Sequence, residues 1–134
     1  MGKKKITVDT NVLISAFGWR GPPHTILEKI ASGELELFTS YEQFEELSKV
    51  LDYPKFEFTE DQKRRFKEFI SEKATFVKSP IKLDIIKKDP SDNKILECAL
   101  VAGADYIISG DDHLLSVQKF GRIRIMKASA FLRI

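Results

Sequence analysis

Cysteine is almost absent from this sequence, since Cys98 is the only one among 134 residues. An internal disulfide is therefore excluded, and the composition fits a reducing compartment. No apolar run approaches the roughly 20 residues that would span a bilayer. The basic stretch Lys3–Lys5 leads into a short apolar run broken by Asp9, which does not resemble the apolar core of a signal peptide. We therefore expect a cytoplasmic protein with no membrane partner.

Ligands for soft metals and glycines for phosphate binding are also scarce. Besides Cys98, the chain offers only His24 and His113 as nitrogen or sulfur ligands, and their spacing matches no zinc motif. No glycine-rich loop follows the first expected strand, which disfavours a dinucleotide-binding enzyme. Cys98 lies among apolar residues and is better interpreted as a core residue than as a nucleophile. His113 stands at an expected helix start, where a histidine is usually structural.

The sequence does have enough apolar residues for one core. Hydrophobic residues make up 43% of the chain, which is sufficient at this length. Charged residues make up 31%, and the net charge of +2 is only mildly favourable to a polyanionic partner. No internal repeat, low-complexity tract or linker is visible, so we expect residues 1–134 to form a single domain.

Apolar runs and the residues that interrupt them predict strands alternating with helices. Strands are expected at 6–8, 35–39, 74–77, 106–109 and 123–126, and short helices at 10–17, 24–31 and 113–117. Three longer helices are expected: one capped by Ser40 that ends before Pro54, one capped by Thr59, and one that follows Asp89-Pro90 and ends at Gly103. This alternation predicts a three-layer α/β/α sandwich around a central, mostly parallel sheet.

Acidic residues follow the expected strands at the edge where such sheets bind ligands. Ligands bind beyond the carboxyl ends of parallel strands, at the point where the strand order reverses. Asp9 ends the first strand, Asp111 follows the strand at 106–109, and Asp92 lies in the first turn of the helix after Asp89-Pro90. Taken singly, each has a simpler explanation, because Asp often caps a helix or complements its dipole. The convergence of separate segments at one edge favours a shared role.

A cation would explain such a cluster, because neighbouring carboxylates repel one another. Mg²⁺ and Mn²⁺ prefer oxygen ligands, and carboxylate-held ions can activate water and stabilise the leaving oxygen of a phosphodiester. Cleavage of nucleic acid is therefore the candidate reaction. Glu46 lies on the helix after the second strand, but Glu42 and Glu45 share that helix and periodicity does not choose among them. A solvated face is the default interpretation of all three.

Four segments, in this order, resemble the motifs of PIN-domain proteins. They are residues 6–13 (ITVDTNVL), Glu46-Leu47 followed by Val50-Leu51, residues 89–93 (DPSDN) with Ala99 beyond, and residues 104–115 (ADYIISGDDHLL). The similarity is greatest to the VapC-type toxin components of prokaryotic toxin-antitoxin systems, and it covers nearly the whole chain. It implies a Rossmann-like PIN fold and Mg²⁺- or Mn²⁺-dependent endonuclease action on RNA.

The resemblance also implies which residues act. By position it selects Asp9, Glu46, Asp92 and Asp111 as the catalytic and metal-binding set, and so distinguishes Glu46 from its neighbours. Asp9 would bind the central metal, Asp92 and Asp111 would complete its shell directly or through water, and Glu46 would position a second ion or the attacking water. Supporting polar residues would be Asn11, Asn93, Asp112 and Ser109, the last at a position where relatives commonly have Thr.

RNA contacts are expected from basic and aromatic groups near this edge. Lys63, Arg64, Arg65 and Lys67 form the densest basic cluster, although a charged helix face more often contacts only solvent. Trp19 and Arg20 lie in the loop after the first helix, where Trp19 would stack on a base or pack against a neighbouring segment or dimer partner. The resemblance further implies a protein antitoxin and a homodimer or higher homo-oligomer, with 128–134 or the apolar faces of the middle helices as the interface.

Two alternatives remain open from the sequence. One is a PIN scaffold that binds RNA or a protein without cutting; retention of all four acidic positions argues against it but does not settle turnover. The other is an Mg²⁺-binding phospho-receiver domain, which also has a doubly wound sheet. Receivers usually need adjacent acidic residues after the first strand, whereas Asp9 is followed by Thr10 and Asn11.

Overall fold

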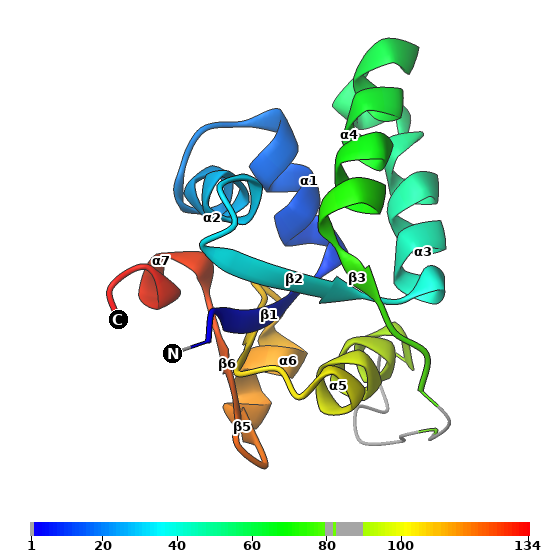
Figure 1. Ribbon diagram of the computed structural model, residues 1–134. Helices are drawn as coiled ribbons and strands as arrows, with labels where there is room; N and C mark the ends of the chain where they lie inside the picture. The colour runs from blue at the N-terminus through cyan, green and yellow to red at the C-terminus, as the bar shows by residue number, and fades with distance from the viewer. Residues whose placement is uncertain (1, 80–81, 83–89) are drawn as a thin grey trace.

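The computed structural model describes residues 2–79, 82 and 90–134, in which strands and helices alternate (Figure 1). The first half contains β1 (Lys4–Val8), α1 (Thr10–Gly18), α2 (Pro22–Ala31), β2 (Leu35–Thr39), α3 (Tyr41–Leu51), the 3₁₀ turn η1 (Pro54–Phe56), α4 (Glu60–Lys73) and β3 (Thr75–Phe76). The second contains α5 (Pro90–Ala102), β4 (Tyr106–Ile108), α6 (Asp112–Val117), β5 (Lys119–Phe120), β6 (Ile123–Met126) and α7 (Ala128–Phe131).

The sheet is parallel except at one edge. Its strand order is β3-β2-β1-β4-β6-β5, and only β5 runs antiparallel to its neighbour among the pairs of the described residues. Ile6 of β1 is in register with Leu37 of β2 on one side and with Tyr106 of β4 on the other. Strands β2 and β3 thus follow one another on one side of β1, and β4 lies on the opposite side of β1. The strand order reverses between β1 and β4, so their carboxyl ends form the edge at which ligands bind in such sheets.

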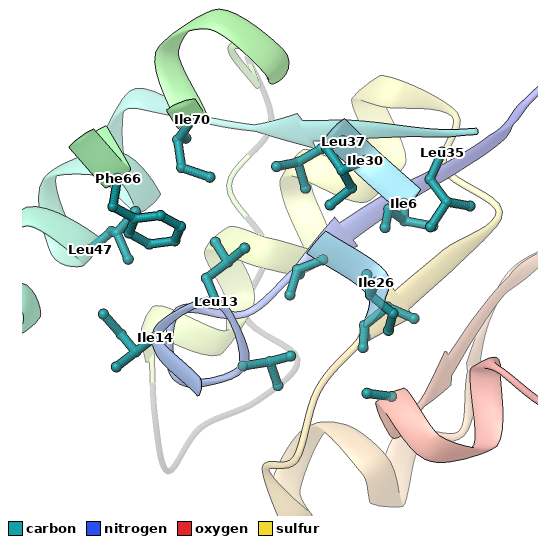
Figure 2. Close-up of a cluster of buried hydrophobic side chains, with 14 of the residues drawn as sticks. Ile6, Leu13, Ile14, Ile26, Ile30, Leu35, Leu37, Leu47, Phe66 and Ile70 are labelled. Carbon is teal, nitrogen blue, oxygen red and sulfur yellow. The ribbon is translucent and has the colours of Figure 1, made fainter. Parts of the chain in front are cut away.

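Helices cover both faces of the sheet, which confirms the predicted three-layer α/β/α architecture. In Figure 1, α1 to α4 lie above β2 and β3, while α5 and α6 lie below. The larger apolar cluster joins side chains of β1 and β2 to those of α1 to α4 (Figure 2). Phe66 of α4 and Leu47 of α3 are almost fully buried there. Burial of each such side chain stabilises the fold by about 1.5–3 kcal/mol, so this cluster holds α3 and α4 against the sheet.

A second apolar cluster lies around α5, β4, α6 and β6. It includes Leu96, Ala99, Ile107 and Leu114, all fully or almost fully shielded from solvent. Cys98 is also buried on α5, as predicted, and burial raises the pKa of its thiol to about 12. Because the thiolate is the reactive form, a buried Cys98 with a raised pKa is a core residue and not a nucleophile.

Helix starts follow the predicted caps. The Ser40 hydroxyl accepts a hydrogen bond from the backbone N–H of Gln43 at 3.2 Å, and Thr59 accepts one from Gln62 at 3.1 Å. The Gln62 side-chain oxygen in turn accepts a hydrogen bond from the Thr59 N–H, which completes a capping box. The predicted cap at Asp89 lies outside the described residues, while the helix that follows ends before Gly103 at φ +65°, as expected.

Several boundaries and short elements differ from the prediction. Helix α2 starts at Pro22 and not at His24, because a proline lacks the N–H that a first helical residue leaves unbonded. The helix predicted at 113–117 begins one residue earlier, at Asp112, because the Asp111 carboxylate caps it. Elements η1, β5 and α7 were not predicted, and strand β3 is limited to Thr75–Phe76. No helix in the described part of the chain is long and apolar enough to cross a membrane.

Candidate functional site

Asp9 stands directly after β1 and has two contacts that hold its carboxylate. One oxygen accepts a hydrogen bond from the backbone N–H of Val12 at 2.9 Å, so Asp9 is the N-cap of α1. The other oxygen accepts a hydrogen bond from the hydroxyl of Ser109. Ser109 directly follows β4, so this bond joins the ends of the two strands between which the sheet order reverses. Asp9 therefore both caps a helix and faces the neighbouring strand.

Ser109 connects Asp9 to the loop that carries Asp111. Its side chain is fully buried, and its oxygen accepts a hydrogen bond from the backbone N–H of Asp111 at 3.0 Å. Asp111 in turn caps α6, because its Oδ1 accepts bonds from the N–H groups of His113 at 2.8 Å and Leu114 at 3.3 Å. One hydroxyl thus links the carboxylate of Asp9 to the backbone of Asp111.

Glu46 is the glutamate of α3 that faces this region. The Thr10 hydroxyl donates a hydrogen bond to Glu46 Oε2 at 3.2 Å, which ties α3 to the start of α1. Glu42 is exposed and forms an ion pair with Lys94 at 2.8 Å, and Glu45 is exposed to solvent. The structure therefore separates three glutamates that helical periodicity left equivalent.

A cavity of about 60 Å³ lies at the carboxyl ends of β1 and β4. It is lined by Asp9, Thr10, Asn11, Gln43, Glu46, Asp92, Ile95 and Asp111. Four of these residues carry carboxylates, and none of the described residues that line the cavity is Lys, Arg or His. Asp92 reaches it from α5 and is only 8% exposed. The structure brings together in one cavity the four acidic residues selected from the sequence.

Burial governs the electrostatics of Asp9. The pKa of its carboxyl is raised, first because burial disfavours the charged form and further because Asp111 is negatively charged nearby. Hydrogen bonds from Ser109 and from the N–H groups of Val12 and Gly110 oppose this rise without cancelling it. An ionised Asp9 is therefore held at a free-energy cost, which a cation in the cavity would offset.

The residues present fit a hard divalent cation. Four carboxylates supply oxygen ligands, which Mg²⁺ and Mn²⁺ prefer, and a cavity of about 60 Å³ has room for an ion with part of its water shell. Candidate ligand atoms of Asp92, Asp111 and His113 all lie within 4.8 Å of one another. The geometry thus offers a place where an ion would contact groups from α5 and from the start of α6.

The predicted supporting residues lie near the cavity and differ in their exposure to solvent. Asn11 is exposed and lines the cavity, Asn93 is buried on α5 beside Asp92, and Asp112 is exposed. Asp112 and Asn11 also line a neighbouring open hollow that shares Asp9 and Asp111 with the cavity. Asp9 and Asp111 therefore border an open hollow as well as the cavity.

Gln43 is a lining residue that the sequence prediction missed. It is 8% exposed, and its side-chain oxygen accepts a hydrogen bond from the Ser40 hydroxyl at 3.2 Å. It precedes Glu46 by three residues, so the two side chains lie on the same side of α3. This spacing is the signal that would have identified it once Glu46 was chosen.

The basic cluster of α4 is largely neutralised by its own neighbours. Lys63 lies 3.0 Å from carboxylate oxygens of Asp52 and Glu60, Arg64 pairs with Asp61 and Glu68, and Arg65 pairs with Asp61 at 2.8 Å. Lys67 lies beside Lys63 and Arg64 along a hollow that also includes Phe44 of α3. RNA contact by this cluster stays a prediction.

Trp19 packs partly against the protein itself. It is 54% exposed, and its ring centroid lies 6.1 Å from that of Phe56 and 6.2 Å from that of Phe58. Trp19 therefore packs against these two rings while about half of its surface stays exposed. Arg20 next to it is exposed. Base stacking by Trp19 and phosphate contact by Arg20 also stay predictions.

Comparison with protein families agrees with these features. A family model described as the PIN domain matches residues 5–113. The matched segment spans most of the chain, runs from β1 into the first turn of α6, and contains all four carboxylates of the cavity. Among curated proteins, none matches this chain.

Proposed function

Because the chain belongs to the PIN-domain family, whose members are generally nucleases, we propose that it is a metal-dependent endoribonuclease. The observation that supports this most strongly is the cavity in which Asp9, Glu46, Asp92 and Asp111 meet from four separate segments. A phospho-receiver domain is disfavoured by the family match. The preference for RNA follows from the resemblance of the motifs to toxin ribonucleases.

Each carboxylate has a proposed role that follows from its position. Asp9, held by Ser109 and Val12, would hold the ion together with Asp92 and Asp111, which line the same cavity. Glu46, oriented by the Thr10 hydroxyl, accepts a proton from the attacking water or positions a second ion. A bound Mg²⁺ or Mn²⁺ supplies Lewis-acid polarisation of the phosphate and a lower pKa for the attacking water.

The substrate would approach from the open hollow beside the cavity. Ions held by the carboxylates of the cavity would attract a phosphate oxygen of the strand, and the neighbouring groups of the strand would lie in the hollow. Asn11, Pro23, Gly110 and Asp112 line the hollow, where Asn11 offers an amide to a phosphate or sugar oxygen. The backbone of a single strand fits such an exposed acidic edge more readily once cations neutralise it.

A cleavage assay tests the proposal directly. A fluorescently labelled single-stranded RNA is incubated with the protein in Mg²⁺, in Mn²⁺ or in EDTA, beside the Asp9→Asn protein. We expect fragments with either ion, none in EDTA and none with the variant. Asp61→Asn on α4 is the matched control, since it makes the same chemical change at an exposed ion pair. Binding of RNA without fragments under every condition would instead identify a non-cleaving scaffold.

We also propose that the protein acts in the cytoplasm as the toxin of a toxin-antitoxin pair and that it forms a homodimer. Ala128 and Phe131 of the C-terminal segment are buried in the chain's own core, so exposed apolar groups such as Leu100 and Val101 of α5 are better candidates for the interface. Expression of the wild type should arrest growth, whereas the Asp9→Asn protein should not. Light scattering should give twice the monomer mass; a monomer with no growth effect would contradict this part.

A further inference from the structure

His113 lies beside the carboxylates but has no part in the proposed set of four. It is the second residue of α6, and its Nδ1 lies 3.6 Å from Asp111 Oδ1. Its side chain is 46% exposed, so it stands at the rim of the site and not in the core. An exposed ion pair at this distance would contribute little to stability. The imidazole is nevertheless directed back toward the Asp111 carboxylate.

Asp92 adds a second carboxylate close to His113. Asp92 comes from α5 and is 8% exposed, yet one of its oxygens lies within 4.8 Å of candidate ligand atoms of both Asp111 and His113. Atoms that share an octahedral ion with bonds of about 2.1 Å lie about 3 Å apart when adjacent and about 4.2 Å apart when opposite. Small side-chain rotations would therefore place one oxygen of each carboxylate and one imidazole nitrogen around a single ion.

We propose that His113 supplies a nitrogen ligand to the divalent ion held by Asp92 and Asp111, and that this makes the site prefer Mn²⁺ to Mg²⁺. The inference rests on the proposed metal site and adds a residue that determines which ion occupies it. Mg²⁺ binds oxygen ligands almost exclusively, whereas imidazole nitrogen is a favourable ligand for first-row transition ions. The carboxylates alone would not distinguish the two ions strongly.

The variant His113→Gln separates this role from a structural one. It keeps a polar side chain and leaves unchanged the backbone N–H that donates to Asp111 at 2.8 Å, so the cap of α6 is retained. Loss of one ligand should weaken Mn²⁺ binding by about tenfold, while Mg²⁺ binding changes by less than about twofold. His24→Gln is the matched control, because His24 is the only other histidine and its Nδ1 contacts the Ala16 carbonyl at 2.9 Å.

The experiment combines calorimetric titration with pulsed electron paramagnetic resonance of the bound Mn²⁺, at pH 8. Wild type and His24→Gln should show hyperfine coupling from a directly bound nitrogen, and His113→Gln should lose it together with the Mn²⁺ preference. Mn²⁺ bound without nitrogen coupling, or an equal loss of affinity for both ions in His113→Gln, would overturn the inference and leave the proposed function intact. No binding of either ion to the wild type would overturn both.

Discussion

The acidic cavity and the basic face of α4 are opposite arrangements of charge. The cavity collects Asp9, Glu46, Asp92 and Asp111 from distant parts of the sequence, with no basic residue among the described residues that line it. The basic face, by contrast, is built from consecutive turns of one helix, and Lys63, Arg64 and Arg65 each pair with at least one carboxylate. Charge is concentrated in the first region and neutralised in the second.

The two regions differ in whether neighbouring groups satisfy the charges. Exposed pairs along a helix satisfy one another and contribute little individually. In the partly buried cavity the pKa of the Asp9 carboxyl is raised, first by burial and then by the nearby charge of Asp111, and the cost of ionising Asp9 persists unless a ligand offsets it. The density of charged residues along the sequence is therefore a poorer guide to a ligand-binding site than the convergence of charged side chains in space.

The largest effect should come from Asp9→Asn. Loss of the central ligand should reduce RNA cleavage by roughly 1,000-fold and abolish tight Mn²⁺ binding, whereas Asp61→Asn should change neither. Because the folded state raises the Asp9 pKa, ionised Asp9 lowers the stability of the metal-free protein above that pKa. The Asn variant should thus melt at a higher temperature than wild type in EDTA at pH 7, and added Mn²⁺ should raise the melting temperature of wild type only. A lower melting temperature for Asp9→Asn would contradict this electrostatic account.

A smaller effect is expected from the glutamate of α3 that faces the cavity. Glu46→Gln should reduce the rate of RNA cleavage by roughly 100-fold, because it removes a proton acceptor that Thr10 orients. Glu45→Gln is the matched control, one position earlier on the same helix and exposed. The rate constants of RNA cleavage by the two variants, measured at saturating Mn²⁺, show whether Glu46 takes part in cleavage. Equal rates for the two variants would remove Glu46 from the site.

The effect of Ser109→Ala should be smaller again and should depend on pH. Its hydroxyl donates to Asp9 and so lowers the pKa of that carboxyl; without it, the pKa rises further. Because ion binding requires the deprotonated form, the acidic limb of the pH profile for Mn²⁺ binding should move to higher pH, with weaker Mn²⁺ binding than in wild type on that limb. Ser109→Thr keeps the hydroxyl and should restore the wild-type profile. An unshifted limb in Ser109→Ala would show that Ser109 does not control Asp9.

The smallest effect on stability and on RNA binding is expected from the basic face of α4. Arg65→Gln leaves Asp61 paired with Arg64, so the melting temperature should change by less than about 2 °C. If the α4 cations contact no phosphates, the salt dependence of RNA binding should also be unchanged. If Arg65 does contact a phosphate, the plot of the logarithm of the RNA-binding constant against the logarithm of the salt concentration should become shallower. The slope should change by about 0.7 for each phosphate of a single strand that the variant no longer neutralises. A change of that size in Arg65→Gln would make α4 part of the RNA-binding surface.

Most of the fold could be predicted because local signals agree with the tertiary structure. Ser40 and Thr59 cap helices as expected, and the apolar runs at 35–39 and 123–126 form β2 and β6. Strand β5 and helix α7 could not be predicted, since they are short and stabilised from outside themselves. Lys119 and Phe120 form a strand only by pairing with β6, and Phe131 of α7 is buried in the larger apolar cluster.

The site was predictable to the extent that strand ends identify it. Asp9 and Asp111 follow parallel strands, which placed them at one edge, whereas Glu46 needed the family resemblance because Glu42 and Glu45 share its helix. Gln43, and the Ser109 hydroxyl that joins Asp9 to Asp111, depend on side-chain geometry across elements. Gln43 could be found only after Glu46 had been chosen, and the bond between Ser109 and Asp9 joins residues 100 positions apart, which no local pattern in the sequence indicates.

A crystal grown in MnCl₂ would show whether oxygen atoms from separate segments jointly hold a divalent ion. Anomalous diffraction recorded near the manganese absorption edge should show a peak within bonding distance of carboxylate oxygens of Asp9, Asp92 and Asp111. The same map from Asp9→Asn crystals should show a much weaker peak or none. Full-occupancy manganese bound elsewhere, with this cavity filled only by water, would contradict the account.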